Sequence, residues 1–369
     1  MMKILHINSY YAAGTFYKPL YERQQEEGLA VAVYVPVPYS ARAPVQDLGP
    51  YTTLSANHGR YDRLFFHLKH GKIYRDLVKR YRPDQFALSH AHSLFSNGYL
   101  ALKLKEDYGL PYLVAVRNTD LNTFFKYMVH LRGLGRRILG EAEKIVFLSR
   151  PYRDRLLARY IPPAQREALY RKAVIIPNGI DDFWLRNRPS GIKKVDPESI
   201  RIFFAGRITP GKNISTTLRA CRLLQDRGYR VRFTVAGRIK SQAEYRALQA
   251  HDFVTYVGYL PREELLHYYR QSDLFVMPSR TETFGRVYAE AMSQGLPVIY
   301  TRGQGFDGQF KDGEVGYPVE SYSAGEIADR VEDIWANYEQ LSKNCLDRAG
   351  QFNWSRIAEE YSRLYSRMR

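Results

Sequence analysis

Short apolar runs recur along the chain, and segments with apolar residues at helical spacing separate them. In the first half, the runs predict strands at residues 3–8, 30–36, 86–90, 112–116, 144–148 and 173–176. Helices are predicted between them, for example at 18–27 and 97–108. Strands that alternate with helices of this length are typical of parallel sheets in α/β domains.

The same alternation starts again in the second half of the chain. Strands are predicted at 200–205, 231–236, 254–257, 274–277 and 298–300, with a helix near 215–227. A segment rich in Pro, Gly and charged residues separates the two series, so the pattern predicts two doubly wound domains. The expected organisation is an N-terminal domain at 1–178, a linker at 179–199, a C-terminal domain at 200–350 and a terminal amphipathic helix at 351–369.

The segment 273–299 predicts a buried strand, a polar turn and a helix. The helix is expected to begin near Gly285 and to bury Val287, Ala291 and Met292. In α/β proteins, such strand-to-helix turns at the carboxyl edge of a parallel sheet bind ligands. The start of a helix suits phosphate, because its first N–H groups are unpaired and the helix dipole is positive there.

Glu282 and Glu290 frame this turn, one before the helix and the other about one and a half turns into it. A carboxylate beside a phosphate site can accept hydrogen bonds from sugar hydroxyls, so the turn suits a phosphorylated sugar. The alternative interpretation places both glutamates on a solvated helix face.

The spacing and neighbours of these glutamates resemble a known family. Seven residues separate them, within the pattern PS…E-x-FG…EAM…G-x-PVI. This is similar to the E-x7-E signature of retaining, nucleotide-sugar-dependent glycosyltransferases of family 4, of the bacterial polysaccharide-biosynthesis type. The resemblance covers nearly the whole chain and implies the GT-B fold. In that fold, two Rossmann-like, doubly wound α/β domains face a central cleft, and a C-terminal helix crosses back to the N-terminal domain.

A second segment, FFAGRITPGKNIS at 203–215, predicts a strand, a glycine-rich turn and a helix start. Arg207 and Lys212 flank the turn, and two cations beside a helix start can bind a diphosphate without a metal. They match the family's Gly-Arg followed by lysine, at a spacing one residue shorter than in some members. The chain contains no D-x-D triplet, in agreement with a metal-independent enzyme. Two surface cations are the alternative.

The resemblance also assigns residues to the donor. Glu290 would hold the ribose hydroxyls, and Glu282 would contact the donor sugar near the reacting carbon. The expected donor-binding residues are Gly14, Gly206, Arg207, Lys212, Gly237, Tyr259, Leu260, Glu282, Thr283, Phe284, Gly285 and Glu290. Glu282 and the two cations are also expected to be catalytic, and Tyr259 and Leu260 to line the base pocket. For Gly237 the alternative is an ordinary turn glycine, and for Phe284 it is a place in the core.

His90-Ala91-His92 ends a predicted strand of the first domain. The H-x-H pattern is compatible with zinc, but no third ligand falls at metal spacing, so no metal site is expected. Family members commonly have a histidine here that faces the donor sugar. His92 is therefore expected to be catalytic, through hydrogen bonding to the sugar or through its backbone carbonyl. A buried structural histidine is the alternative.

Two further positions are assigned by the resemblance. Gly14 corresponds to a glycine loop near the diphosphate, although YYAAGTFY contains one glycine where the family usually has two or more. After the strand at 112–116, many members have a histidine, whereas this chain has Arg-Asn-Thr-Asp. Asn118 and Asp120 are therefore expected to bind the acceptor, with a surface cap as the alternative for Asp120.

The net charge of +17 on 369 residues would attract nucleic acid, anionic membrane or phosphorylated ligands. Basic residues concentrate at 60–82, where Leu64, Phe65, Phe66 and Leu68 lie among them. We interpret this segment as a surface that binds anionic lipid, with a solvated helix face as the alternative. The chain has no recognised nucleic-acid-binding motif, so no nucleic-acid partner is expected.

Cys221 and Cys345 give no disulfide framework, and no signal sequence or membrane-spanning run is seen, which favours the cytoplasm. The sequence thus predicts a retaining, metal-independent glycosyltransferase, peripheral at the inner face of the membrane. It would need no cofactor and would move a sugar from a UDP-linked donor to a glycan, which we expect to be lipid-linked. Alternatives are a non-catalytic membrane-associated scaffold that binds sugar nucleotides, a GT-B sugar-nucleotide epimerase, a phosphorylase and a basic nucleic-acid binder.

Overall fold

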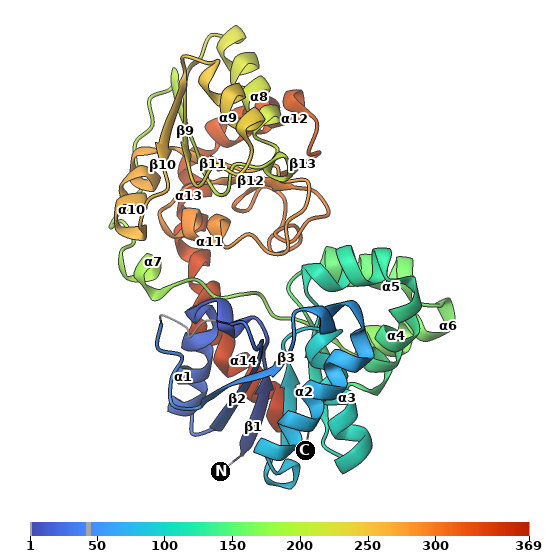
Figure 1. The fold of residues 1–369 in the computed structure, drawn as a ribbon. Coiled ribbons are helices and arrows are strands. Elements are labelled where there is room, and N and C mark those ends of the chain that lie inside the picture. Colours follow the sequence, from blue (N-terminus) through green and yellow to red (C-terminus); the bar gives the residue numbers. More distant parts are fainter. Residues whose placement is uncertain (1, 42–45, 369) are drawn as a thin grey trace. The chain divides into compact units, whose positions relative to one another are not determined.

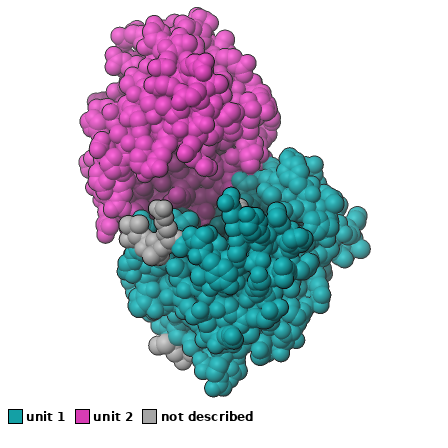
Figure 2. All heavy atoms as spheres, viewed as in Figure 1, with its two compact units in different colours: residues 1–148, 153–177, 354–369 teal, residues 149–152, 178–353 magenta. Residues whose placement is uncertain are grey.

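The computed structural model describes residues 2–41 and 46–368, which form two compact units (Figures 1 and 2). Unit 1 comprises residues 1–148, 153–177 and 354–369, and unit 2 comprises residues 149–152 and 178–353. Each unit has its own parallel sheet with helices packed against it, as the alternating pattern predicts.

The sheet of unit 1 has the strand order β3-β2-β1-β4-β5-β6-β7, and every strand pair is parallel. Its strands are β1 (Lys3–Ile7), β2 (Ala30–Pro38), β3 (Thr52–His58), β4 (Leu88–Ala91), β5 (Tyr112–Ala115), β6 (Lys144–Phe147) and β7 (Ala173–Ile175). The sequence pattern missed β3, because TTLSANH lacks the apolar run that marks the other strands. The strand order reverses between β1 and β4, which is where open α/β sheets form ligand crevices.

Helices cover both faces of this sheet. They are α1 (Lys18–Glu26), α2 (Phe66–Arg80), α3 (Ser96–Tyr108), α4 (Arg132–Glu141), α5 (Arg150–Tyr160, most of it in unit 1), α6 (Pro163–Lys172) and α14 (Trp354–Ser366). Successive side chains of β2 point to opposite faces of the sheet, and each face packs against different helices. Val33 and Val35 belong to the core shared with α1 and α14, whereas the Tyr34 hydroxyl between them donates to Asp76 on α2 at 2.7 Å.

The terminal helix α14 packs on α1, which confirms the predicted return of the chain to the N-terminal domain. Its apolar stripe, Ile357, Tyr361, Leu364 and Tyr365, is buried in the core of unit 1. The Arg23 side chain on α1 also donates a hydrogen bond to the Ser355 hydroxyl at 3.0 Å.

The sheet of unit 2 repeats the topology, with the order β10-β9-β8-β11-β12-β13 and parallel pairing throughout. Its strands are β8 (Ser199–Ala205), β9 (Arg230–Ala236), β10 (Val254–Gly258), β11 (Leu274–Val276), β12 (Val298–Thr301) and β13 (Gly316–Val319). The short edge strand β13 was not predicted, since its sequence GYPV combines a glycine with a proline. Here the strand order reverses between β8 and β11.

The helices of unit 2 are α7 (Asp182–Arg186), α8 (Ile214–Asp226), α9 (Gln242–Gln249), α10 (Arg262–Gln271), α11 (Arg286–Ser293), α12 (Ala324–Ala336) and α13 (Tyr338–Arg348). The short helix α7 lies in the segment predicted as a linker. It is capped by the Asp181 side chain, which accepts a hydrogen bond from the Phe183 N–H at 2.8 Å, and Trp184 is buried. The linker segment is therefore ordered as part of unit 2.

Cys221 and Cys345 are both buried and unbridged, as their number suggested. Among the described residues, no helix combines the length and the apolar character that crossing a bilayer requires.

Candidate functional site

Three glycines end neighbouring strands of unit 2, Gly206 after β8, Gly237 after β9 and Gly258 at the end of β10. Gly237 has a φ of 144°, and a Cβ atom there would lie 1.8 Å from the Gly206 carbonyl oxygen. Its N–H donates to the Gly258 carbonyl at 2.6 Å. No residue with a side chain fits between these backbones, so Gly237 is more than an ordinary turn glycine.

A cavity of about 350 Å³ opens against these glycines. Five of the predicted donor residues line it, namely Gly206, Arg207, Gly237, Tyr259 and Leu260. Leu260 and other apolar side chains form much of the wall, which suits one flat face of a nucleotide base. The cavity therefore brings together residues from the ends of three strands that are far apart in the sequence.

The sequence missed three side chains in this wall, Arg238, Leu265 and Val287. The Arg238 guanidinium lies 4.2 Å from the centre of the Tyr259 ring, in a cation–π arrangement. Val287 was expected in the core, but it is only partly buried and faces the cavity. Helical spacing alone does not distinguish a core position from a cavity wall, so the sequence carried no signal for this difference.

Lys212 and Glu282 meet beside this cavity. Lys212 lies in a short 3-10 turn (Pro210–Lys212) after β8, and its Nζ donates a hydrogen bond to the Glu282 carboxylate from the loop after β11. The two side chains are 20% and 16% exposed. Lys212 also approaches the cavity, since its Cε lies 3.9 Å from the position of a Gly206 Cβ. Both residues are thus part of one site at the reversal of strand order.

Hydrogen bonds fix the backbone next to Lys212 and the backbone of Glu282 independently of each other. Asn213 has a left-handed conformation with φ 57°, and its amide donates to the Pro278 carbonyl at 3.0 Å, which ties the turn after β8 to the turn after β11. The Glu282 N–H donates to the Gln304 side chain at 3.1 Å, and its carbonyl accepts from the Gly305 N–H at 2.8 Å. These bonds position the ion pair.

The turn before α11 leaves backbone available to a ligand. Gly285 has a φ of 75°, and a Cβ there would lie 2.4 Å from the Tyr288 ring, so only glycine fits. No side chain caps the helix start. The Phe284 ring is buried beside Phe306 and Phe352, which assigns that side chain to the core and leaves its backbone as the part that could contact a donor.

Glu290 lies on α11, three residues after Val287 of the cavity wall. Burial raises the pKa of Glu290, and the nearby Arg286 charge and a hydrogen bond with Tyr269 act against that rise. Glu282 is held by Lys212, so neither glutamate lies on a solvated helix face. The solvated-face interpretation of the two glutamates is wrong.

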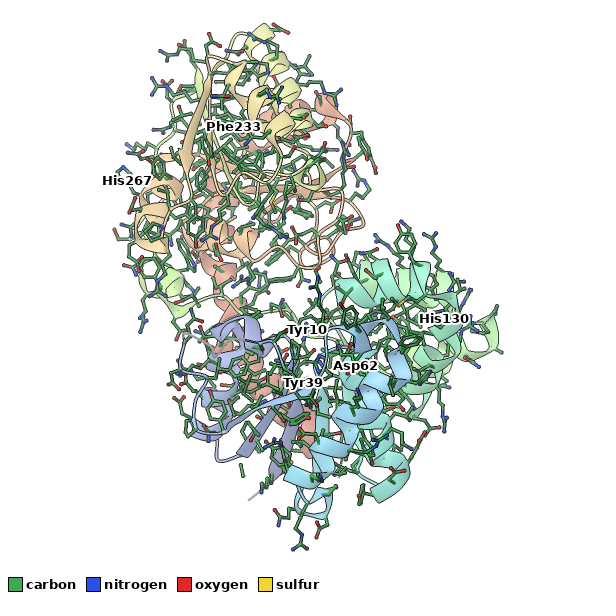
Figure 3. The ribbon with its side chains drawn as sticks, in the orientation of Figure 1. Tyr10, Tyr39, Asp62, His130, Phe233 and His267 are labelled. Atoms are coloured by element: carbon green, nitrogen blue, oxygen red, sulfur yellow. The ribbon has the colours of Figure 1, made fainter. Side chains whose placement is uncertain are left out.

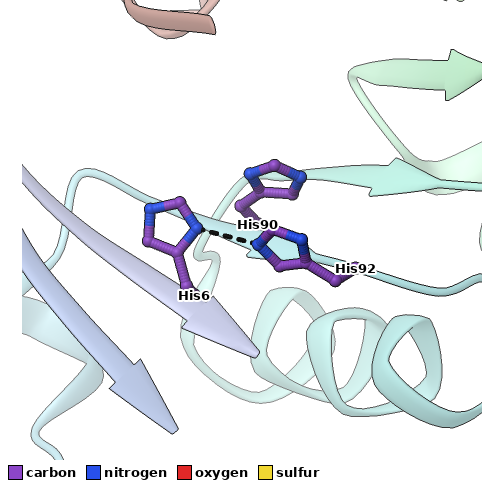
Figure 4. A group of neighbouring side chains, drawn as sticks. All are labelled: His6, His90 and His92. Atoms are coloured by element: carbon purple, nitrogen blue, oxygen red, sulfur yellow. Dashed lines mark hydrogen bonds between the residues drawn. The ribbon is translucent and has the colours of Figure 1, made fainter. Parts of the chain in front are cut away.

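Three histidines cluster in unit 1, His6 on β1, His90 on β4 and His92 just after it (Figure 4). His6 Nδ1 and His92 Nε2 are 3.1 Å apart, and His90 Nδ1 lies 2.8 Å from the Tyr365 hydroxyl of α14. Burial lowers the pKa of His6 to about 3. It also lowers the pKa of His90 and of His92 well below the usual range.

This cluster corrects the argument from spacing, because His6 supplies the third histidine that the sequence seemed to lack. Their ring nitrogens lie within 4.8 Å of one another. The rings of His90 and His92 stack, however, with centres 4.0 Å apart and planes 15° from parallel. Stacked rings direct their in-plane lone pairs side by side, whereas a zinc ion about 2.0–2.1 Å from each nitrogen needs them to converge. The arrangement suits a buried hydrogen-bonded network better than a metal centre.

His92 is fully buried, and its ring packs among His6, His90, Tyr17 and Tyr21. Its backbone carbonyl accepts a hydrogen bond from the Arg117 guanidinium at 3.0 Å. The His92 ring is therefore a buried structural histidine, which was the alternative interpretation. A catalytic role for His92 would have to act through its backbone carbonyl.

Asp120 is buried and accepts hydrogen bonds from three backbone N–H groups, those of Leu94, Phe95 and Arg117, at 2.8–3.2 Å. Burial raises its pKa to about 6, against these hydrogen bonds. The Asp120 carboxylate thus joins the turns after β4 and β5. These contacts fit neither of the two predicted roles, which were binding the acceptor and capping at the surface.

Asn118 pairs with Asn122, and Gly14 has a φ of 153° between two 3-10 turns. Both remain predictions.

Two family models match adjoining parts of the chain. The model for glycosyl transferases group 1 matches residues 188–351, and the model for glycosyltransferase family 4 matches residues 4–182. Among curated proteins, the D-inositol 3-phosphate glycosyltransferase of Pseudarthrobacter chlorophenolicus is 28% identical over 304 residues, which represent 76% of this chain and 71% of that protein.

Solved structures with the same fold cover nearly the full length of both chains. Sucrose-phosphate synthase from Thermosynechococcus elongatus has a TM-score of 0.74 and 20% identity, and the match covers 100% of this chain and 99% of that one. HepE from Anabaena, solved in complex with UDP and glucose, has a TM-score of 0.69 and 15% identity, with 99% and 100% covered. At these identities the likeness shows the fold, which confirms the predicted GT-B architecture.

Proposed function

Since this chain belongs to the retaining glycosyltransferases of family 4, which transfer a hexose from a nucleotide-sugar donor, we propose that its donor is a UDP-sugar and that it works without a metal. We propose further that the acceptor is a glycan on a lipid carrier, met at the cytoplasmic face of a membrane. The observation that carries the donor assignment is the cavity between Gly206, Gly237 and Tyr259, with Lys212 beside it.

The donor would lie along the carboxyl edge of the unit 2 sheet. The base fits the apolar cavity, and the ribose hydroxyls reach Glu290, whose helix also supplies the Val287 wall. The diphosphate then lies near Lys212 and Arg207, where each charge-assisted hydrogen bond contributes about 1.5–3 kcal/mol. HepE, which has the same fold, was solved in complex with UDP and glucose, and this likeness supports uridine as the base.

The chemistry follows from where charge develops. As the bond between the sugar and the diphosphate breaks, negative charge grows on the leaving phosphate, and the Lys212 and Arg207 cations stabilise it in the way that Mg²⁺ does in other transferases. The leaving phosphate then takes the proton of the attacking acceptor hydroxyl, so the new bond forms on the same face of the sugar. Glu282 contacts the donor sugar near the reacting carbon.

The membrane assignment rests on a surface of unit 1 that combines exposed apolar residues with cations. Tyr61, Leu64, Phe65 and Leu68 are 78%, 73%, 65% and 50% exposed. They lie at the start of α2 and in the 3-10 turn before it (Tyr61–Leu64), whose Asp62 is labelled in Figure 3. Asp62, the one acidic residue of that turn, pairs with Lys72 at 2.9 Å. Exposed apolar side chains among cations are typical of surfaces that enter the interface of anionic bilayers.

A thermal-shift experiment tests the donor assignment. The full-length protein is melted with UDP, GDP and ADP in turn, each with Mg²⁺ and with EDTA. A ligand that binds only the folded state at a hundredfold excess over its Kd stabilises it by about 2.7 kcal/mol. UDP is expected to raise the Tm equally in both buffers, and Arg207→Ala should lose the shift. A shift that needs Mg²⁺, or that only another nucleotide produces, contradicts the proposal.

A further inference from the structure

The hydroxyl of Tyr269 contacts the helix that carries Glu290 of the candidate donor site. Tyr269 belongs to α10, and its side chain is fully buried. Its hydroxyl lies 3.4 Å from the Val287 carbonyl oxygen on α11 and forms a hydrogen bond with the Glu290 carboxylate. Val287 and Glu290 are three residues apart on α11, so they share a face of that helix. The hydroxyl of another helix is thus directed at the face of α11 that forms a wall of the donor cavity.

This hydroxyl has one hydrogen to donate, and the carboxylate is the stronger of its two acceptors. A charged acceptor forms shorter and stronger hydrogen bonds than a neutral carbonyl does, and 3.4 Å to the Val287 carbonyl is long for an O–H donor. Within the part of the chain that the structure describes, Tyr269 is the one hydrogen-bond partner of the Glu290 side chain. The Tyr269 hydroxyl therefore sets the direction in which the Glu290 carboxylate points.

Aromatic rings hold the Tyr269 ring in place. The Trp184 ring lies 5.4 Å from it at an angle of 83°, and the Phe203 ring lies 4.8 Å from it at 80°, both in edge-to-face contact. The Phe275 ring lies 6.1 Å away. Since these rings restrict the tyrosine, its hydroxyl is already at Glu290 before a donor binds, and such preorganisation lowers the cost of binding.

Trp184 is itself attached to the helix that carries Glu290. It lies on α7, which contacts α11 (Figure 1). The backbone carbonyl of Trp184 accepts a hydrogen bond at 3.1 Å from the side chain of Gln294, the residue that ends α11. The segment that the sequence predicted as a linker therefore supports the donor site of unit 2 through Tyr269.

We propose that Tyr269 is a positioning residue for Glu290, which it orients toward the ribose hydroxyls of the donor. Tyr269 does not line the cavity, so its effect on the donor passes through the glutamate. This inference deepens the proposed function and rests on it, because it takes the ribose as the group that Glu290 holds.

The test measures the affinity of the full-length protein for UDP and for 2′-deoxy-UDP by calorimetry. The two probes differ by one ribose hydroxyl, so the ratio of their Kd values reports the contact with Glu290. The variants are Tyr269→Phe, Glu290→Gln and the two combined. Tyr268→Phe is the matched control, since it changes the next residue of α10, whose hydroxyl makes no hydrogen bond with the described residues.

Tyr269→Phe keeps the aromatic ring in its surroundings, so the variant should fold, and a thermal melt checks this. If the melt shows an unfolded protein, Trp184→Phe takes its place, because it loosens the Tyr269 ring and keeps the hydroxyl. That variant should lower the ratio of the two Kd values in the same direction.

Wild type and Tyr268→Phe should bind UDP about tenfold more tightly than 2′-deoxy-UDP, and Tyr269→Phe should reduce this ratio to about threefold or less. By itself, Tyr269→Phe should weaken UDP binding about tenfold. In the Glu290→Gln background the same change should weaken it by less than about twofold, because the two residues act as one unit.

An unchanged ratio in Tyr269→Phe overturns the inference, and so does a wild type that binds both probes equally. A loss that is the same for both probes, or that adds in full to the loss in Glu290→Gln, also overturns it, because Tyr269 then has only a structural role. If wild type binds another nucleotide in place of UDP, the uridine assignment fails, and that nucleotide and its 2′-deoxy form decide this inference. If wild type binds no nucleotide, the donor proposal fails and this inference fails with it.

Discussion

The ammonium group of Lys212 donates a hydrogen bond to the carboxylate of Glu282, at the point where the strand order of unit 2 reverses. Both side chains are mostly shielded from water. An incoming diphosphate would compete with Glu282 for the lysine. We therefore expect donor binding to transfer Lys212 to the phosphate and to release the Glu282 carboxylate toward the sugar.

Lys212→Ala should lower kcat/KM by about a hundredfold to a thousandfold, because it removes a cation from the charge that develops on the leaving phosphate. Lys343→Ala, a change of the same charge at an exposed position of α13, should leave kcat/KM unchanged. Steady-state kinetics with a UDP-sugar measure both. Wild-type activity in Lys212→Ala would show that Lys212 does not contribute to the proposed site.

Gly237→Ala should destabilise the protein by about 3 kcal/mol or more and abolish UDP binding. The new Cβ would collide with the Gly206 carbonyl oxygen, so the strand ends must separate and the cavity must change shape. Denaturant unfolding and UDP titration provide the measurements. The control is Gly325→Ala on α12, where a Cβ meets no atom within 4 Å and the change should stay within about 1 kcal/mol.

Arg238→Ala should raise the KM for the UDP-sugar about tenfold and leave kcat nearly unchanged. The guanidinium lies over the Tyr259 ring at the wall proposed to hold the base, so its loss should affect ground-state binding and the transition state equally. Arg246→Ala on the exposed face of α9 serves as the charge control. If kcat fell and KM stayed constant, Arg238 would belong to the reacting centre.

The histidine cluster should make unit 1 sensitive to acid. In the folded protein the pKa of His6 is lowered to about 3, so only the unfolded chain takes up a proton near pH 6.5. The stability that the neutral ring gives is present above pH 6.5 and is lost as the pH falls toward 3. Between pH 7 and pH 5 the loss is about 2 kcal/mol for His6 alone.

Thermal melts of wild type and His6→Gln at these two pH values test this dependence. Wild type should lose more Tm on acidification than His6→Gln does. Asp120 acts in the opposite direction, since its pKa is raised to about 6 and its folded form gains a proton over this range. Both proteins share that contribution, so it cancels in the comparison. Equal losses of Tm in the two proteins would contradict the prediction.

Local pattern was enough to predict much of this protein. The alternation of apolar runs with amphipathic segments determined two doubly wound domains, because each element carries its own periodicity. The turn with Glu282 and the turn with Lys212 could also be predicted from the sequence, since each turn follows directly after a strand. Cavity-wall glycines such as Gly206 and Gly237 could be named because the family pattern marks them.

The tertiary structure alone decided which of these residues meet. His6 joins His90 because β1 and β4 are neighbours in exact register, a pairing that depends on strand order across more than eighty residues. Arg238 and Val287 line the candidate donor cavity of unit 2 for the same reason, since three strand ends and a helix converge there. Sequence periodicity sets which face of an element is buried, whereas sheet order sets what that face meets.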